Sequence, residues 1–161
     1  MNLEITNRIL ENVLYRQELQ KLKELEKDRI FCRHGIEHSL DTARIAMILC
    51  RENGIEINPD IIYSSALLHD IGRSREYTGK IPHHSASVSI AGQILDSINC
   101  PPDIKKSVIS LIENHRNPDN DRSTPEYIFY IADKKSRLCF VCPASRECYW
   151  SEEKKNLKIE V

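Results

Sequence analysis

The chain has 161 residues, 40% hydrophobic and 29% charged, which is the length and mixture of one globular domain. Its 23 lysines and arginines nearly balance its 24 aspartates and glutamates, so charge gives no signal for nucleic acid or an anionic membrane. The first residues mix charges with apolar side chains, unlike a signal peptide or a membrane span, and the protein is expected to be cytoplasmic.

Apolar residues recur at helical spacing along most of the chain, and no stretch alternates convincingly with period two. We predict helices over residues 3–27 (one long helix or two in succession), 37–53, 59–70, 83–98, 102–115 and 124–140. Asn53 and Gly54 have the chemistry of a helix C-cap, and Pro59 stands at a first-turn position. Residues 73–82 are expected to form a loop, and the fold class is all-α.

Several polar residues end or interrupt these apolar helices. The six histidines are His34, His38, His69, His83, His84 and His115. Asp133 follows the apolar run YIFYIA. A single helical histidine is more often a hydrogen-bonded core group than a ligand, and Asp70 alone could simply hold the His69 ring. Taken together, however, these residues are best explained by convergence on one site, because burying each without a partner is costly.

The adjacent His69 and Asp70 lie in the segment ALLHDIG and cannot both point down one helix face. At a helix end they can flank a metal pair, with Asp70 bridging. Mixed imidazole and carboxylate ligands favour Fe, Mn, Co, Ni or Zn over Mg or Ca, so the sequence predicts one or two divalent transition metal ions.

The order H…HD…H…H…D, with the words HSLDTARIA, ALLHDIG, PHHSAS, ENHR and IADK, resembles the HD superfamily of metal-dependent phosphohydrolases. The resemblance covers about residues 29–137, and its spacing is most similar to the bacterial group that includes symmetrical diadenosine tetraphosphate hydrolases. It implies a single-domain helical bundle over residues 29–150, with an N-terminal helical segment (1–28) packed on it and a C-terminal tail (151–161). That tail is a short helix or a frayed end.

The resemblance also implies roles for individual residues. The mononuclear metal set of the superfamily matches His38, His69, Asp70 and Asp133, and the two further histidines of its dinuclear branch match His83 and His115. Of the neighbours His83 and His84, the first aligns with the family position. His34 lies four residues before His38 and is a hydrogen-bond donor that supports a ligand, a helix-start group or, as the minority alternative, a ligand itself.

Hydrolysis of a phosphate ester needs an activated water and charge neutralisation on the phosphoryl oxygens. A dinuclear site bridged by Asp70 would supply the first. Among the nearby cations, Arg73 and Lys134 match basic positions beside the family motifs and are expected to act with Asp70, whereas Arg75 and Arg116 fit solvated surface charges better. The expected substrate is a small phosphate ester, most simply a nucleotide.

Three cysteines, Cys139, Cys142 and Cys148, form a C-x2-C-x5-C spacing within residues 139–148. Cys32 precedes His38 by six residues and Cys139 follows Asp133 by six, so antiparallel helices meeting at the metal would make these two cysteines neighbours. The four cysteines can hold a separate zinc ion or iron–sulfur cluster, or they are reduced, partly buried thiols. Cys50 and Cys100 look like ordinary core or loop residues.

The leading hypothesis is therefore a metal-dependent phosphohydrolase. The alternatives are a non-catalytic regulatory module that keeps the metal or nucleotide pocket, and a di-iron oxygenase, since the HD scaffold also hosts oxygen chemistry. The sequence gives no information on oligomeric state.

Overall fold

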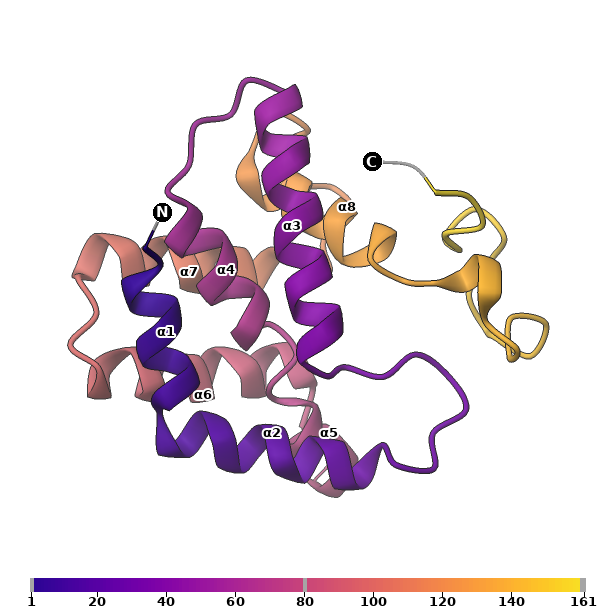
Figure 1. Ribbon diagram of the computed structural model, residues 1–161, viewed down its shortest axis with the longest axis horizontal. Coiled ribbons are helices and arrows are strands. Elements are labelled where there is room, and N and C mark those ends of the chain that lie inside the picture. The colour runs from indigo at the N-terminus through magenta and orange to yellow at the C-terminus, as the bar shows by residue number, and fades with distance from the viewer. Residues whose placement is uncertain (1, 80, 160–161) are drawn as a thin grey trace.

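The computed structural model describes residues 2–79 and 81–159, and these contain helices and no strand, so the all-α prediction is confirmed. Figure 1 shows the helices packed around α3 and α4. The elements are α1 (Glu4–Glu11), α2 (Val13–Leu25), α3 (Ile36–Glu52), α4 (Pro59–Leu68), α5 (Arg73–Gly79), α6 (His83–Ser97), α7 (Pro102–Asn114), α8 (Pro125–Lys135) and the 3₁₀ helix η1 (Cys139–Val141).

The N-terminal helical region is two helices in succession. The chain is extended at Asn12 (φ −66°, ψ 131°), whose side chain accepts a hydrogen bond from the Tyr15 N–H and so caps α2. The first helix is fixed to α4 because the Asp60 carboxylate accepts the Ile5 and Thr6 N–H groups, each at 2.8 Å. One carboxylate therefore caps α1 and docks it on the centre of the fold.

Helix α4 is the centre because it packs against α1, α3, α6 and α7. It is apolar nearly all round, as expected of a helix buried on every side. Leu67 and Leu68 belong to an apolar cluster with residues of α1, α6 and α7, whereas Ile62 and Ala66 belong to a second cluster with α3 and α8. The end of α4 consequently lies between the two clusters.

The loop predicted for residues 73–82 is wrong over most of its length, because Arg73–Gly79 form helix α5. The segment is polar, and its apolar spacing gives no helical signal. Tertiary hydrogen bonds hold it instead: the buried Ser74 hydroxyl donates to Glu18 of α2 (2.6 Å), and Glu76 accepts from the His83 N–H (3.2 Å). Residue 80 lies outside the described residues.

Helix α8 ends at Lys135, so the helix predicted to continue to residue 140 is too long. The Ser136 hydroxyl donates to the Asp133 carbonyl (2.8 Å), which the next N–H of an α-helix would use. The Arg137 N–H instead donates to Lys134 (3.2 Å). Beyond this point only η1 is regular among the described residues.

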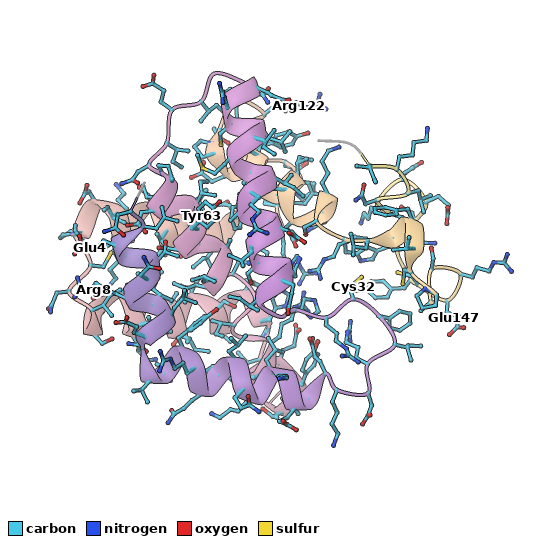
Figure 2. The ribbon with its side chains drawn as sticks, in the orientation of Figure 1. Glu4, Arg8, Cys32, Tyr63, Arg122 and Glu147 are labelled. Atoms are coloured by element: carbon cyan, nitrogen blue, oxygen red, sulfur yellow. The ribbon has the colours of Figure 1, made fainter. Side chains whose placement is uncertain are left out.

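The C-terminal segment, residues 138–159, lies beside the loop of residues 26–35 that joins α2 to α3 (Figure 1). Figure 2 shows Cys32 of that loop and Glu147 of the segment on the same side of the molecule. Residues 151–159 form turns and no helix, and the Asn156 amide ties them to α8 by donating to the carbonyls of Lys135 (2.6 Å) and Arg137 (2.8 Å). Residues 160 and 161 lie outside the described residues.

Candidate metal centre

His69 and Asp70 follow the last residue of α4 directly, and both side chains are buried. His69 has helical backbone angles and its Nδ1 atom donates to the Ala66 carbonyl (2.9 Å), which turns Nε2 away from the helix. Burial in the middle of the apolar core would be costly for both groups without partners. Their partners come from the ends of the surrounding helices.

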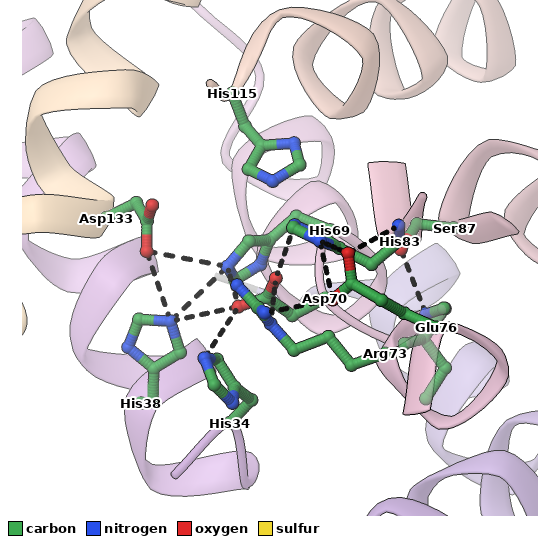
Figure 3. A network of polar contacts seen from close by, with 12 residues as sticks. His34, His38, His69, Asp70, Arg73, Glu76, His83, Ser87, His115 and Asp133 are labelled. Carbon is green, nitrogen blue, oxygen red and sulfur yellow. Dashed lines mark hydrogen bonds and ion pairs between the residues drawn. The ribbon is translucent and has the colours of Figure 1, made fainter. Parts of the chain in front are cut away.

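One group of ligand atoms combines α3, the end of α4 and α8. Its members, whose ligand atoms all lie within 4.8 Å of one another, are His38, His69, Asp70 and Asp133. The Nε2 atom of His38 lies 3.3 Å from Nε2 of His69 and 3.2 Å from Oδ1 of Asp133 (Figure 3). Nε2 of His69 lies 3.2 Å from Oδ2 of Asp70.

A second group shares Asp70 and adds the first residue of α6 and the residue after α7. Asp70, His83 and His115 again place their ligand atoms within 4.8 Å of one another. The two oxygens of Asp70 divide between the groups: Oδ2 faces His69, whereas Oδ1 lies 3.4 Å from Nε2 of His83. The structure thus brings together all six residues that the family resemblance implies, and Asp70 is the residue that the two groups share.

Each of the four histidines in these groups has its Nδ1 atom occupied by an outer partner. His115 donates to the Ile112 carbonyl (2.6 Å), and His83 donates to the Glu76 carboxylate (3.0 Å). His38 lies 2.9 Å from the Ser136 hydroxyl, which gives its own proton to the Asp133 carbonyl and therefore accepts from His38. Such outer hydrogen bonds fix the orientation of each ring, so that its Nε2 atom faces the other ligand atoms of its group.

Removing the hydroxyl in Ser136→Ala is expected to lower the metal affinity of the first group by about 10–100-fold, because the His38 tautomer and ring orientation lose their support. Competition with a fluorescent chelator measures the affinity. Ser89→Ala, on the exposed face of α6, is the matched control and should bind as the wild type does. Equal affinity of both variants would show that Ser136 does not position the ring.

The bare atoms support occupation by a cation. Buried side-chain atoms without a hydrogen-bond partner include Nε2 of His83, Nε2 of His115 and Oδ2 of Asp70. Buried polar atoms normally have a hydrogen-bond partner, so three neighbouring atoms without one need an explanation. A transition metal ion with imidazole and carboxylate ligands fits all three.

The electrostatics keep the carboxylates charged and two of the histidines neutral. Burial raises the pKa of Asp70, but Arg73 and His69 outweigh it and hold the pKa well below its usual range. Burial lowers the pKa of His115 to about 3 and that of His34 to about 4. Burial also opposes the charged form of His69, yet the carboxylates of Asp70 and Asp133 raise its pKa to about 9.

Metal binding is therefore expected to displace a proton. At pH 7 His69 carries a charge in the metal-free protein and must lose it to become a ligand, so binding should release about one proton per chain. Because the folded pKa is about 9, the affinity should rise with pH, at most tenfold per unit, and level off above that value. Titration calorimetry in buffers of different ionisation enthalpy counts the protons. If no proton were released at pH 7, His69 would not be a charged group that becomes a metal ligand.

Three cations lie against the carboxylates. Arg73 donates from Nε to Oδ1 of Asp70 (2.8 Å), and Lys134 is hydrogen-bonded to Asp133. The third, Arg137, lies 3.3 Å from Oδ1 of Asp133 and 3.5 Å from Oδ2 of Asp70 and is itself buried. Arg137 was not among the predicted site residues. Its helical spacing of four residues after Asp133 was the available signal.

The remaining histidines stay outside both groups. Nε2 of His34 lies 3.9 Å from Asp70, while its other ring nitrogen and its backbone N–H bind Glu26, which also accepts from the Tyr77 hydroxyl. This arrangement favours a supporting role for His34 beside the ligand groups over direct metal ligation. His84 contributes a ring contact to His83 and has a buried Nδ1 atom without a hydrogen-bond partner. Glu26 and Glu76, which orient His34 and His83, were not among the predicted site residues.

Cys32 lies near Cys139 and Cys142, close enough for the thiol charges to interact, although neither Cys32 nor Cys139 stands on the helix from which their proximity was predicted. Among the described residues, the cysteine sulfurs belong to no group of three or more ligand atoms within 4.8 Å. Cys50 is buried in the core and Cys100 is half-buried.

The HD domain family model matches residues 35–138, and the chain therefore belongs to the HD domain family. An uncharacterized protein of Clostridium beijerinckii is 39% identical over 153 residues, covering 95% of this chain and 96% of that protein. Ribonuclease Y of Mycoplasma genitalium is 34% identical over 106 residues, which are 66% of this chain and 20% of the ribonuclease. No solved structure matches the chain.

Members of this family are typically metal-dependent hydrolases, and the two ligand groups of this chain fit metal binding. The resemblance to the HD superfamily is thus confirmed. None of the described helices is long and apolar enough to span a membrane.

Proposed function

We propose that this protein is a metal-dependent phosphohydrolase that acts on nucleotides or other small phosphate esters. The observation that carries the proposal is the sharing of one buried carboxylate, Asp70, between two groups of metal-ligating atoms. Two ions held there would supply a water of lowered pKa and polarise a bound phosphate. The family membership supports the same class of reaction.

A cavity of about 470 Å³ opens beside the site and reaches His115 and Asp133. Its size is that of small-molecule pockets. Its lining is rich in cations, namely Arg29, Arg73, Arg116, Lys134, Arg137 and Lys154. It also holds aromatic rings, namely Phe31, Tyr130, Tyr149 and Trp150. Cations bind phosphoryl oxygens and aromatic faces stack on bases, so this lining supports a nucleotide substrate.

The cationic and the aromatic parts of the cavity lining meet at Lys134. Its ammonium lies 4.9 Å from the centre of the Tyr130 ring and 5.9 Å from that of Trp150. Lys134, Arg73 and Arg137 also contact the carboxylates of the ligand groups. Phosphate charge would therefore be neutralised next to the ligand groups, with aromatic surface within reach of a base.

Replacing the cation in Lys134→Met is expected to lower kcat/KM by about 10²-fold, because the phosphoryl charge loses one positioned donor. Steady-state kinetics on the best substrate measures the change. Lys106→Met, an exposed position on α7, is the matched control. If the two variants were equally active, Lys134 would have no role in binding the phosphate.

The proposal is tested by turnover. Protein stripped of metal and reloaded with Mn²⁺ or, without oxygen, Fe²⁺ is offered nucleoside mono-, di- and triphosphates, diadenosine tetraphosphate and a short RNA. The last is included because of the ribonuclease relative. Metal-dependent release of phosphate or nucleotide supports the proposal. Tight metal binding without hydrolysis would favour the regulatory module, and oxygen consumption by the iron-loaded protein would favour the oxygenase.

A further inference from the structure

The C-terminal segment, residues 138–159, keeps its position without a hydrophobic core of its own. None of its residues belongs to either apolar cluster, and most of its larger apolar side chains are exposed, including Val141 (67%), Tyr149 (82%) and Ile159 (82%). Its described regular structure is the single turn of η1. Small folded units that lack a core usually depend on a disulfide or a metal centre.

The segment contains no disulfide, since all the cysteines of the protein are free thiols. It does contain Cys139, Cys142 and Cys148, and the loop of residues 26–35 beside it contributes Cys32. Cys32 and Cys142 are among the residues that line one cavity, and Cys32, Cys139 and Cys148 are among those that line the cavity described above. The four cysteines therefore stand where the segment meets the loop.

Electrostatics around the thiols is consistent with this placement. Burial raises the pKa of Cys32, the neighbouring Cys139 and Cys142 raise it further, and Arg137 opposes them. The hydrogen bond with Glu152 raises the pKa of Lys155, and the neighbouring Cys148 and Cys139 raise it further. Two cations, Arg137 and Lys155, are thus at hand to offset the negative charge of several thiolates, the form in which cysteine binds metal.

We propose that Cys32, Cys139, Cys142 and Cys148 hold a metal centre through four thiolates, and that this centre fixes the C-terminal segment against the loop of residues 26–35. The centre is separate from the histidine and aspartate groups. Because three of its cysteines line the substrate cavity, it would also set the positions of Tyr149 and Trp150, the two aromatic residues that the segment contributes to that cavity.

Four thiolates can hold either a zinc ion, with zinc–sulfur bonds of about 2.3 Å in a tetrahedron, or an iron–sulfur cluster. Either centre would draw the sulfurs together on binding, because no three of the four thiols lie within 4.8 Å of one another in the described residues.

The test measures iron, zinc and acid-labile sulfide per chain in full-length protein purified without oxygen or chelator. Cys142→Ser and Cys148→Ser are compared with Cys100→Ser, a half-buried cysteine outside the group, and with Asp70→Asn, which disables only the other site. We expect the first two variants to lose metal that the last two retain. Lost iron with sulfide identifies a cluster, and lost zinc without sulfide identifies a tetrahedral ion.

A second readout follows the position of the segment itself. Limited trypsin digestion should cleave Cys142→Ser and Cys148→Ser after Arg146 or Lys154 at least tenfold faster than Cys100→Ser, while the circular dichroism of the helices stays unchanged. Equal metal content in all four cysteine forms, including the wild type, would overturn the proposal. So would thiol titration that finds these cysteines paired in disulfides. Neither outcome depends on the phosphohydrolase proposal.

Discussion

Asp70→Asn is expected to remove both metal ions from the histidine and aspartate groups and to lower the rate of phosphate ester hydrolysis by roughly 10³-fold or more, equivalent to about 4 kcal/mol. Asp70 is the only residue common to both groups, and each of its oxygens faces a different one. Asparagine keeps the shape but replaces one oxygen by an amide nitrogen that cannot bind a metal.

Metal content per chain and kcat/KM measure the two effects. Asp41→Asn makes the same chemical change at a half-exposed carboxylate on α3, where the ion pair with Arg44 (3.4 Å) is of little consequence. This control should keep its metal and its activity. Circular dichroism at the assay temperature must show that Asp70→Asn is still folded. An Asp70→Asn protein with full metal content would show that the shared carboxylate is not a ligand.

A second variant, compared with Asp70→Asn, distinguishes a site for one metal ion from a site for two. His115 belongs only to the second group, so His115→Gln should lose about half of the metal and keep the ion of the first group. If the wild type already binds a single ion and His115→Gln binds the same amount, the site is mononuclear and His115 has another role. The pair of variants therefore tests the bridging position of Asp70 directly.

The ligand residues were predictable because each is a polar group in apolar surroundings. His69 and Asp70 end a helix buried on every side, and Asp133 follows six mostly apolar residues. Burying such groups costs free energy, so their presence in the sequence already implied compensation by partners. The family resemblance then identified the partners, and the structure places them together.

The supporting residues were not predictable in this way. Glu76, Ser136 and Arg137 lie in polar segments, where a carboxylate, hydroxyl or guanidinium is unremarkable in the sequence. Glu76 and Ser136 become informative only when tertiary packing brings Glu76 to His83 and Ser136 to His38, whereas Arg137 had one local signal, its position four residues after Asp133. The same reason explains why α5 was taken for a loop: its stability comes from contacts with α2 and α6 and not from its own apolar spacing.

Gly72 could be predicted from the sequence as a special position, but only the tertiary packing explains why it is a glycine. In the sequence it stands just beyond a helix end, the usual place for a glycine with positive φ. That explanation holds for Gly54 (φ 67°) and not for Gly72, which is absent from the described residues with positive φ. A Cβ atom on Gly72 would instead lie 2.3 Å from the Ser87 nitrogen and 2.5 Å from the His83 carbonyl oxygen. The glycine is needed because α6 approaches the chain so closely.

Gly72→Ala is therefore expected to push the first turn of α6 away from the end of α4. His83 lies 3.4 Å from Asp70, and the Gly72 N–H donates to the Ser87 hydroxyl (2.9 Å), so both contacts would open. The atoms that the new methyl group meets belong to the backbone and cannot rotate aside. We expect a loss of roughly 1–3 kcal/mol in the free energy of unfolding and weaker binding of the second ion.

Denaturant unfolding of the metal-free protein and metal content per chain measure these effects. Gly92→Ala on α6 is the matched control, because a Cβ atom on Gly92 meets nothing within 4 Å. Alanine should stabilise that helical position by up to about 1 kcal/mol and leave the metal content unchanged. Opposite signs for one substitution at two glycines would show that close approach, and not helix propensity, explains Gly72. Equal stability of the two variants would mean that α6 yields at little cost and that the distance between His83 and Asp70 does not depend on Gly72.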